Sequence, residues 1–404
     1  MRLASLLLAA SLLSAPALAQ QNYGSAPSSP SKPFNQTAVT SFDEPWALAF
    51  LPDTRMLVTE KAGKLWLVGP GATKVRVTGV PTVHHDGQGG LLFVALSPTF
   101  ARDHGVYLTY AEPGAGGDSL ALARGSLSIG TGVASLKDVH VLWRELPRGK
   151  GGQYGGYLAF APDGKSLFLT SGERMRFLPA QDPNQATGKI LHLTLDGHPA
   201  PGNPFAGKTG ATTIELMDPP ADTVAAPSAP KRKVSVPAPN LVPAETWSTG
   251  HRNQYGLAFD AAGRLWETEM GPRGGDELNL IQPGRNYGWP LVSYGMNYDG
   301  KPIPNPGTRP DLAKPTLYWN PVIAPAGFTF YYGKLFPQWR GNAFVGGLAG
   351  QCIVRIVVNG TQAAQANRWD MDNRIRFVTA GPDGALWVLE DGNGGRLLRL
   401  TPKV

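Results

Sequence analysis

A pattern of alternating apolar and polar residues recurs along the chain, each time as two short runs joined by turn residues. The copies read WALAFLPDTRMLVTE from Trp46, LLFVALSPTFARDHGVYLTYA from Leu91, YLAFAPDGKSLFLTSGE from Tyr157, YGLAFDAAGRLWETEMG from Tyr255, FVTAGPDGALWVLED from Phe377 and, in degenerate form, GFTFYYGKLFPQWRGNAFVGGLAG from Gly327. Such alternation around turn residues is typical of β-hairpins. Further apolar runs follow the copies, as in KLWLVG after the first, so each repeat supplies about four strands.

These repeats predict an all-β fold, a six-bladed β-propeller of four-stranded antiparallel blades. We expect the propeller to occupy residues 38–404, after a flexible segment at 20–37. The first strand, near Ala38 to Phe42, is expected to close the ring against the last blade, because closure removes exposed strand edges.

The longest interval between repeats contains a Pro/Ala-rich stretch, at about residues 206–243. We interpret it as a poorly ordered surface insertion with no chemistry of its own. It includes the basic triplet Lys231-Arg232-Lys233, which we interpret as solvated charge because short charge runs are usually exposed.

Residues 1–19 have the features of a secretory signal peptide: a charged Arg2, an apolar run from Leu3 to Leu13 and a small-x-small cleavage site ending at Ala19. The apolar run is shorter than the about 20 residues that span a bilayer. No later segment is long and apolar enough. We therefore expect a periplasmic or secreted protein without a membrane span.

The amino-acid composition further limits the possible fold and ligand classes. Glycine (50) and proline (37) are abundant, which disfavours helical bundles, and the single cysteine, Cys352, excludes an intramolecular disulfide. The net charge of +7 is compatible with an acidic ligand but equally with a solvated basic surface. An exported chain without the basic motif of a known binding fold is not expected to bind nucleic acid.

Polar motifs flank the recurring hairpins, at the positions that a propeller brings together around its channel. His84-His85-Asp86 precedes the second copy, but neighbours on a strand point to opposite faces, so the two histidines are not expected to share a metal ion. Gln88, between glycines that allow close approach, is the better candidate for a ligand contact. Gln153 opens the third copy, and Glu173 lies at its far end.

Three more motifs carry candidate chemistry. Arg252-Asn253 follows His251 and precedes the fourth copy. Gly271-Pro272 and Asp276-Glu277 offer carbonyl and carboxylate oxygens of the kind calcium prefers, without the spacing of an EF-hand. Arg374 and Arg376, two apart on a strand, share one face and suit a ligand with several carboxylates.

In this order the motifs resemble the soluble pyrroloquinoline quinone (PQQ)-dependent glucose/sorbosone dehydrogenase family, including the bacterial aldose sugar dehydrogenases. The resemblance covers the chain from Trp46 to Pro402, apart from the insertion. It rests on GQGGLL at Gly87, GHRN at Gly250, GP at Gly271, GGDELNLI at Gly274, NYGWP at Asn286 and RIR at Arg374. The family is a six-bladed propeller that oxidises an aldose hydroxyl or an aldehyde hydrate.

The resemblance implies roles for individual residues. The residues that would contact PQQ are Gln88, Arg252, Asn253, Tyr298, Arg374 and Arg376. The calcium ligands would be the carbonyls of Gly271 and Pro272, with Glu277 and the Tyr287 carbonyl at a second site. In the family, hydride passes to the quinone carbon, which calcium and an arginine polarise, while a general base takes the hydroxyl proton. Arg252 would be that catalytic arginine.

The chain departs from the family pattern at four positions. Gln153 stands where the family has its basic histidine, and a neutral amide cannot accept a proton. Tyr157 replaces a usual arginine, Phe377 a usual aspartate, and Ala349 a lysine that contacts PQQ in several relatives. Our candidate for the replacement base is Glu173, ahead of Asp86, His84 and His85, because strand pairing can bring it to the mouth that Gln153 opens.

The sequence therefore predicts an exported PQQ- and calcium-dependent dehydrogenase of a sugar or related alcohol or aldehyde, which passes electrons to an external acceptor. Two alternatives stay open. One is a non-catalytic propeller that binds PQQ or a saccharide, because the base is missing. The other is a calcium-dependent lactonase, because propellers host many functions.

Overall fold

A computed structural model describes residues 20–403, so the expected signal peptide at 1–19 lies outside the described residues. The all-β prediction is confirmed: the described chain is built from short strands, and its two α-helices, α1 (Phe100–Asp103) and α2 (Val242–Glu245), are single turns. Five 3-10 helices complete the described elements: Pro70–Ala72, Leu178–Gln181, Ala226–Ser228, Pro306–Thr308 and Pro337–Trp339. No described helix is long and apolar enough to cross a membrane.

The strands form four-stranded antiparallel meanders. The first two meanders join into one eight-stranded sheet, ordered β3 (Pro45–Phe50), β4 (Met56–Glu60), β5 (Lys64–Val68), β6 (Lys74–Thr78), β10 (Val133–Arg144), β9 (Gly117–Gly130), β8 (Gly105–Gly114) and β7 (Leu91–Leu96). The junction is a short parallel pairing of β6 with β10, the outermost strands of the two meanders.

The remaining meanders form separate sheets. The third is β11 (Gly155–Phe160), β12 (Ser166–Ser171), β13 (Lys189–Thr194) and β16 (Thr246–Thr249). The fourth is β17 (Gln254–Phe259), β18 (Leu265–Glu269), β19 (Asp276–Ile281) and β20 (Leu317–Trp319), extended by β1 (Gln21–Asn22). The fifth is β21 (Pro325–Phe330), β22 (Ala343–Gly347), β23 (Cys352–Asn359) and β24 (Gln362–Asp370). The last is β25 (Ile375–Ala380), β26 (Leu386–Glu390), β27 (Gly395–Pro402) and β2 (Phe34–Phe42).

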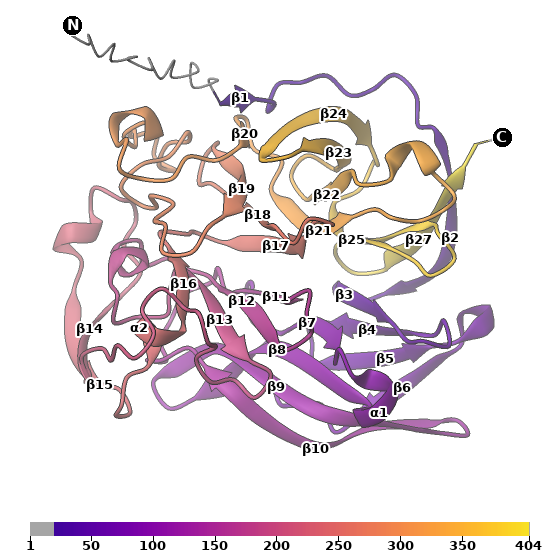
Figure 1. The fold of residues 1–404 in the computed structure, drawn as a ribbon, viewed down its shortest axis with the longest axis horizontal. Helices are drawn as coiled ribbons and strands as arrows, with labels where there is room; N and C mark the ends of the chain where they lie inside the picture. Colours follow the sequence, from indigo (N-terminus) through magenta and orange to yellow (C-terminus); the bar gives the residue numbers. More distant parts are fainter. Residues whose placement is uncertain (1–19, 404) are drawn as a thin grey trace, which may run out of the picture.

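The first strands of the meanders line the centre of the molecule (Figure 1). Each contacts the first strand of the next meander, in the order β3, β7, β11, β17, β21, β25 and back to β3. Their aromatic side chains fill the axis: the rings of Trp46, Phe93, Tyr157 and Tyr255 pack at centroid distances of 4.8 to 6.5 Å. The recurring apolar run thus supplies the inner strands, and the turns between strands lie at the two ends of the channel.

The chain closes on itself as the sequence predicted. Strand β2 pairs antiparallel with β27, from Phe34 opposite Pro402 to Phe42 opposite Gly395. This strand starts at Phe34, and Gln21 and Asn22 pair with β20. The structure therefore places parts of residues 20–37, which we expected to be flexible, in strands.

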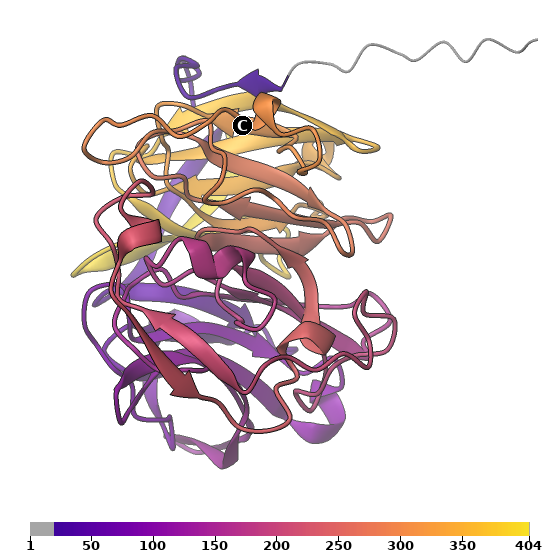
Figure 2. The same ribbon diagram turned by 90° about the vertical axis from the view of Figure 1, so that its left-hand side faces the viewer.

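The Pro/Ala-rich segment carries regular structure where the sequence predicted none. Strands β14 (Thr213–Met217) and β15 (Lys231–Ser235) form a two-stranded antiparallel sheet. It lies beside the third meander, and Figure 2 turns it toward the viewer. Ile214, Leu216 and Met217 are buried, because the apolar face of β14 packs against the body of the protein. The basic triplet begins β15, where its side chains are mostly exposed.

Candidate functional site

A cavity of about 300 Å³ opens at one end of the central channel. Three residues predicted from the sequence line it: Gln88, Arg374 and Arg376. The sequence analysis missed four further polar residues of its wall, namely Glu44, Lys61, Tyr255 and Asp391. Tyr255 lies in β17, the first strand of the fourth meander. Glu44 immediately precedes β3, and Lys61 and Asp391 immediately follow β4 and β26, so only the closed ring brings all four together.

The two arginines share one carboxylate. Nε of Arg374 donates to Oδ2 of Asp391 at 2.8 Å, and Nε of Arg376 donates to Oδ1 of the same residue at 2.9 Å. Burial alone would raise the pKa of Asp391, but the two guanidinium groups outweigh it and hold the pKa below its ordinary value. Asp391 therefore stays ionised and orients both arginines on one wall of the cavity, as their spacing predicted.

Lys61 adds a third cation to this cavity. Its Nζ donates to the carbonyl of Gly87 at 2.9 Å and to Oε1 of Glu44 at 3.1 Å. With Arg374 and Arg376 it gives three positive charges against two carboxylates, so the cavity carries a net positive charge. Such a cavity favours an anionic ligand.

A second polar group, centred on Gln153, adjoins this cavity. Oε1 of Gln88 accepts a hydrogen bond from the backbone N–H of Gln153 at 2.8 Å, which joins the two groups. The Gln153 side chain is buried between Glu173 and Arg252. We assign its amide with Nε2 toward Glu173, because only this orientation satisfies both atoms: Nε2 then donates to Oε1 of Glu173, and Oε1 accepts from Nη2 of Arg252 at 2.8 Å. The three side chains predicted as catalytic therefore form one hydrogen-bonded row.

The backbone conformation around Gln153 allows Glu173 to lie close to it. Gln153 has a φ of +54°, and a Cβ on Gly172 would lie 1.9 Å from the Gln153 carbonyl oxygen. Only glycine fits at position 172, and its absence of a side chain lets the end of β12 bring Glu173 to Gln153. Strand pairing across β11 and β12 thus produces the neighbourhood that the sequence predicted.

Glu173 has no exposed surface. Burial raises its pKa to about 7, against the opposing effect of Arg252 and of the backbone N–H groups of Phe177 and Arg176. A carboxyl group with this pKa exchanges a proton near neutral pH. Because Gln153 lies between them, Glu173 is linked to Arg252 through the Gln153 amide by two hydrogen bonds.

Arg252 is held from several sides. Nη1 donates to the carbonyls of Met270 at 3.0 Å and Gly271 at 2.7 Å, and Nη2 donates to the Tyr298 hydroxyl at 3.3 Å. Its backbone N–H donates to Oε2 of Glu269 at 2.5 Å. Neighbouring Asn253 accepts from the Gly155 N–H at 3.4 Å through its Oδ1.

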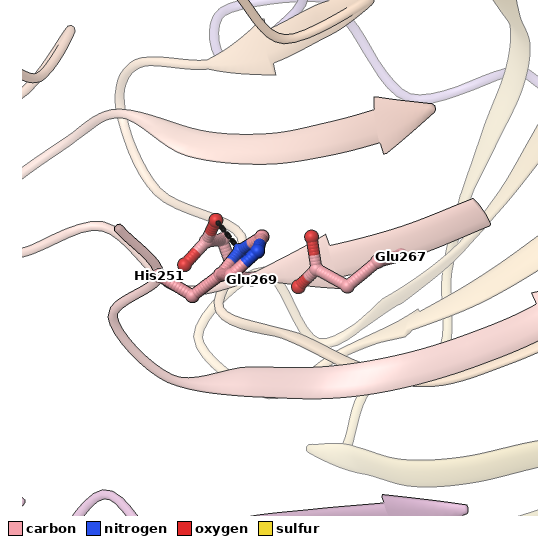
Figure 3. A group of neighbouring side chains, drawn as sticks. All are labelled: His251, Glu267 and Glu269. Atoms are coloured by element: carbon pink, nitrogen blue, oxygen red, sulfur yellow. Dashed lines mark hydrogen bonds and ion pairs between the residues drawn. The ribbon is translucent and has the colours of Figure 1, made fainter. Parts of the chain in front are cut away.

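Behind Arg252 lies a buried carboxylate cluster. Nδ2 of Asn279 faces three glutamates, Glu267 at 3.1 Å, Glu269 at 3.1 Å and Glu277 at 3.2 Å. His251 Nδ1 lies 3.2 Å from Oε1 of Glu269, as Figure 3 shows. One amide group has two protons for three carboxylates. Among residues 20–403, Oε1 of Glu267 and Oδ1 of Asn279 find no hydrogen-bond partner.

These carboxylates lack sufficient compensating charge. Burial, together with the charge of Glu269, raises the pKa values of Glu267 and Glu277 well above the ordinary value. A small space of about 20 Å³ lies against Glu269, Glu277 and Tyr287. This volume holds one small ion or water.

Three of the four predicted calcium ligands line the same small space. Glu277 and Tyr287 border the small space, which Gly271 also lines. The Gly271 carbonyl accepts from Arg252, and its N–H donates to Oδ1 of Asp276 at 2.8 Å. Burial raises the pKa of Asp276 to about 7 despite three backbone N–H donors. Pro272 follows in the same turn.

The paired histidines bind different carboxylates. Nε2 of His84 lies 3.5 Å from Asp118, and Nε2 of His85 lies 2.8 Å from Glu44. The prediction that they do not share an ion agrees with this arrangement, although they lie in a loop and not in a strand. Within residues 20–403, His84, His85 and Asp86 form no hydrogen bond or ion pair with the side chains of Gln153, Glu173 and Arg252, so Glu173 remains the candidate base.

Two of the departures from the family pattern touch each other. The rings of Tyr157 and Phe377 stack at a centroid distance of 6.4 Å and an interplanar angle of 26°. The Tyr157 hydroxyl also accepts a hydrogen bond from the Gly327 N–H at 3.0 Å. Both side chains belong to the aromatic filling of the channel, so these departures change its packing together.

Comparisons with known proteins agree with the resemblance. A family model described as glucose/sorbosone dehydrogenase matches residues 42–214 and 228–399. Aldose sugar dehydrogenase YliI of Escherichia coli (strain K12) is 38% identical over 376 residues, covering 89% of this chain and 91% of the relative. Quinoprotein glucose dehydrogenase B of Acinetobacter calcoaceticus is 28% identical, covering 88% and 85%.

Solved structures of sugar dehydrogenases also have a similar fold. The apo form of the soluble aldose sugar dehydrogenase of Escherichia coli superposes with a TM-score of 0.78 at 35% identity, covering 92% of this chain and 100% of that one. The PQQ-bound form of the aldose sugar dehydrogenase of Streptomyces coelicolor superposes with a TM-score of 0.70 at 28% identity, covering 92% and 98%. The all-β fold is thus that of propeller-type PQQ sugar dehydrogenases.

Proposed function

Because this chain belongs to the glucose/sorbosone dehydrogenase family, we propose that it is an exported PQQ- and calcium-dependent dehydrogenase of a sugar or related alcohol or aldehyde. The observation that carries the proposal is the cavity with Arg374, Arg376 and Lys61 on its walls, next to the row of Gln153, Glu173 and Arg252. It combines a site for an anionic cofactor with a proton-exchanging group at one channel mouth.

The cavity suits PQQ, which is planar and carries three carboxylates. Arg374 and Arg376 would bind carboxylates on one wall, Lys61 would do so on another, and Gln88 would hydrogen-bond the ring system. Arg252 and Asn253 would lie toward the quinone oxygens, with Tyr298 above them. When bound, PQQ supplies a quinone that accepts a hydride.

The carboxylate cluster suits calcium. Glu277, the neighbouring Glu269 and the Tyr287 carbonyl would hold one ion in the small space, where it would offset the excess negative charge. A second ion would use the carbonyls of Gly271 and Pro272 beside the cofactor. The Gly271 oxygen accepts one hydrogen bond from Arg252 and has a second lone pair available.

Gln153 has no proton-accepting group, so we assign proton removal to Glu173. With a pKa of about 7, Glu173 is half ionised at neutral pH. Gln153 would orient the substrate hydroxyl by its amide, and Arg252 would stabilise negative charge on the substrate oxygen. Transfer to Glu173 requires Gln153 to move aside or a water to bridge, because Glu173 is fully buried.

The finer features of the architecture belong to the same proposal. The meanders are the six blades of one propeller spanning residues 38–404, with an insertion at about 206–243. Residues 1–19 are the signal peptide that sends the protein to the periplasm or medium, where an external acceptor removes electrons from the reduced cofactor.

Gln153 also favours one alternative, a propeller that binds PQQ or a saccharide without turnover. Reconstitution separates the two. The mature protein is titrated with PQQ, with and without calcium, while quinone absorption and dye-linked oxidation of aldoses, alcohols and aldehydes are followed. Calcium-dependent binding with turnover supports the dehydrogenase, and binding without turnover supports the alternative. Absence of binding refutes the PQQ assignment and leads to lactonase assays.

A further inference from the structure

We infer that the insertion at residues 206–243 forms one wall of the substrate entrance and positions Tyr298 over Arg252. The inference rests on the proposed function and adds a residue set that the reaction itself does not require. Its key contacts join Asp222 and Thr223 of the insertion to Asn297 and Lys301 of the turn that carries Tyr298.

Tyr298 occupies an unusual position for an aromatic side chain. It is 67% exposed, yet its hydroxyl accepts a hydrogen bond from Nη2 of the buried Arg252. Nη2 of Arg252 also donates to Gln153. Tyr298 therefore stands at the solvent edge of the row that includes Gln153 and Glu173, where an incoming substrate passes.

The turn that carries Tyr298 is fixed at its base. Met296 and Arg273 exchange two backbone hydrogen bonds of 3.1 Å, next to Gly271-Pro272. The N–H of Asn297 donates to the Lys301 carbonyl at 2.9 Å, and the N–H of Gly300 donates to the Asn297 carbonyl at 2.9 Å. Its outer side is held by the insertion.

Oδ1 of Asn297 accepts two hydrogen bonds from Thr223, from the backbone N–H at 3.0 Å and from Oγ1 at 3.1 Å. Asn297 is 2% exposed, although the next residue along the chain is the exposed Tyr298. Lys301 Nζ forms an ion pair with Oδ2 of the buried Asp222 at 2.9 Å. Two adjacent residues of the insertion thus bind both ends of the turn, one by hydrogen bonds and the other by an ion pair.

The insertion is also anchored on the opposite side of the mouth. Nε2 of Gln185 donates to the Glu215 carbonyl at 3.2 Å, and the N–H of Ala211 donates to Oδ1 of Asn184 at 2.8 Å. Asn184 and Gln185 lie in the loop that continues from Glu173. The insertion therefore bridges from the Glu173 loop to the Tyr298 turn.

This arrangement makes Asp222, Thr223 and Asn297 positioning residues that act through Tyr298. Loosening them leaves Gln153, Glu173 and Arg252 in place but frees Tyr298 from its contact with Arg252. The expected change is in substrate binding, with a raised KM and a nearly constant kcat, because the lost contact is made before the chemical step.

The test uses Asn297→Ala and the milder Asp222→Asn in the mature chain loaded with PQQ and calcium. We expect KM to rise about tenfold in Asn297→Ala, the size of a lost buried hydrogen-bond pair, with kcat within about twofold. In a Tyr298→Ala background the same substitutions should have no further effect, because residues acting through one group are not additive. Asp311→Asn, at an exposed ion pair with Arg309, is the matched control and should change nothing.

Hydrogen exchange of the amides at 296–301 gives a readout that is independent of turnover. Exchange should accelerate in Asp222→Asn and Asn297→Ala and stay unchanged in Asp311→Asn. If no substrate is oxidised at all, the proposed function fails. The exchange data still test whether the insertion holds the 296–301 turn in place. The inference is overturned if exchange and KM both stay unchanged in these two variants. It is also overturned if their KM rises equally with and without Tyr298.

Discussion

The side-chain amide of Gln153 donates a hydrogen bond to the carboxylate of Glu173. Gln153 is neutral at every useful pH, whereas Glu173 has a pKa raised to about 7 by burial. The pair therefore includes one group that titrates near neutrality, beside the residue that the resemblance matches to the family's histidine base.

A first prediction concerns Gln153→His. An imidazole at this position lies beside Glu173, which would orient it, and general-base catalysis contributes about 10²- to 10⁴-fold. We expect kcat to rise by up to that factor with little change in the dissociation constant of PQQ. Gln153→Ala is the control, because it removes the amide without adding a base. Equal kcat in the two variants would show that this position does not host proton transfer.

A second prediction concerns the pH profile. If the ionised form of Glu173 accepts the substrate proton, kcat/KM should rise with pH around a midpoint near 7 and level off above it. Glu173→Gln should lower the rate and abolish this rise. Stopped-flow reduction of the bound quinone between pH 5 and 9 measures both. A variant with full activity and an unchanged profile would disprove the assignment of Glu173.

A third prediction concerns the cofactor cavity. Arg376→Met removes a charged donor that is 9% exposed, and charge-assisted hydrogen bonds contribute about 1.5–3 kcal/mol. PQQ affinity should fall about 10- to 100-fold in an absorbance titration of the apo protein. Arg399→Met, at a surface ion pair with Asp383, should bind PQQ like the unmodified protein. Equal affinity in all three proteins would place PQQ elsewhere.

A fourth prediction concerns calcium. An ion bound by Glu277 stabilises the folded state by about 2.7 kcal/mol at a calcium concentration 100 times its Kd. Chelation should therefore lower the Tm, and Glu277→Gln should reduce this response. Glu215→Gln, at an exposed glutamate, should respond to chelation like the unmodified protein. Calorimetry with and without chelator measures these changes in Tm. An unchanged Tm on chelation would contradict a calcium site at Glu277.

A fifth prediction concerns stability and Glu245. This buried carboxyl accepts a hydrogen bond from Trp143 Nε1 at 2.9 Å, and burial raises its pKa from 4.5 to about 7. Between these values the unfolded chain has released the proton that the folded protein still holds. The contribution of Glu245 to stability is therefore full below pH 4.5 and declines as pH rises to about 7, by roughly 3 kcal/mol at most.

Glu245→Gln removes this titration. Relative to the unmodified protein, the variant should gain stability as pH rises from 4.5 to 7. Urea unfolding at pH 4.5 and pH 8 measures the difference. A pH-independent difference would show that Glu245 titrates normally.

Much of the fold followed from local pattern. Alternation around turn residues predicted the strands, and the pairing of β2 with β27 was predicted because an open ring would leave two exposed edges. The spacing of Arg374 and Arg376 also predicted their shared face, since neighbours two apart on a strand point the same way.

What the sequence determined by itself was therefore the local part: strand positions, the all-β class and the identity of the polar motifs at the strand ends. Only the tertiary structure decided which of these motifs meet. Lys61 and Glu44 of the first meander and Asp391 of the last joined the cavity without a local signal, because only ring closure brings these two meanders together. The insertion had the composition of a disordered segment, yet Thr223 and Asp222 bind Asn297 and Lys301. Composition reports the average burial a segment can achieve, whereas these few long-range polar contacts depend on the geometry of the closed ring.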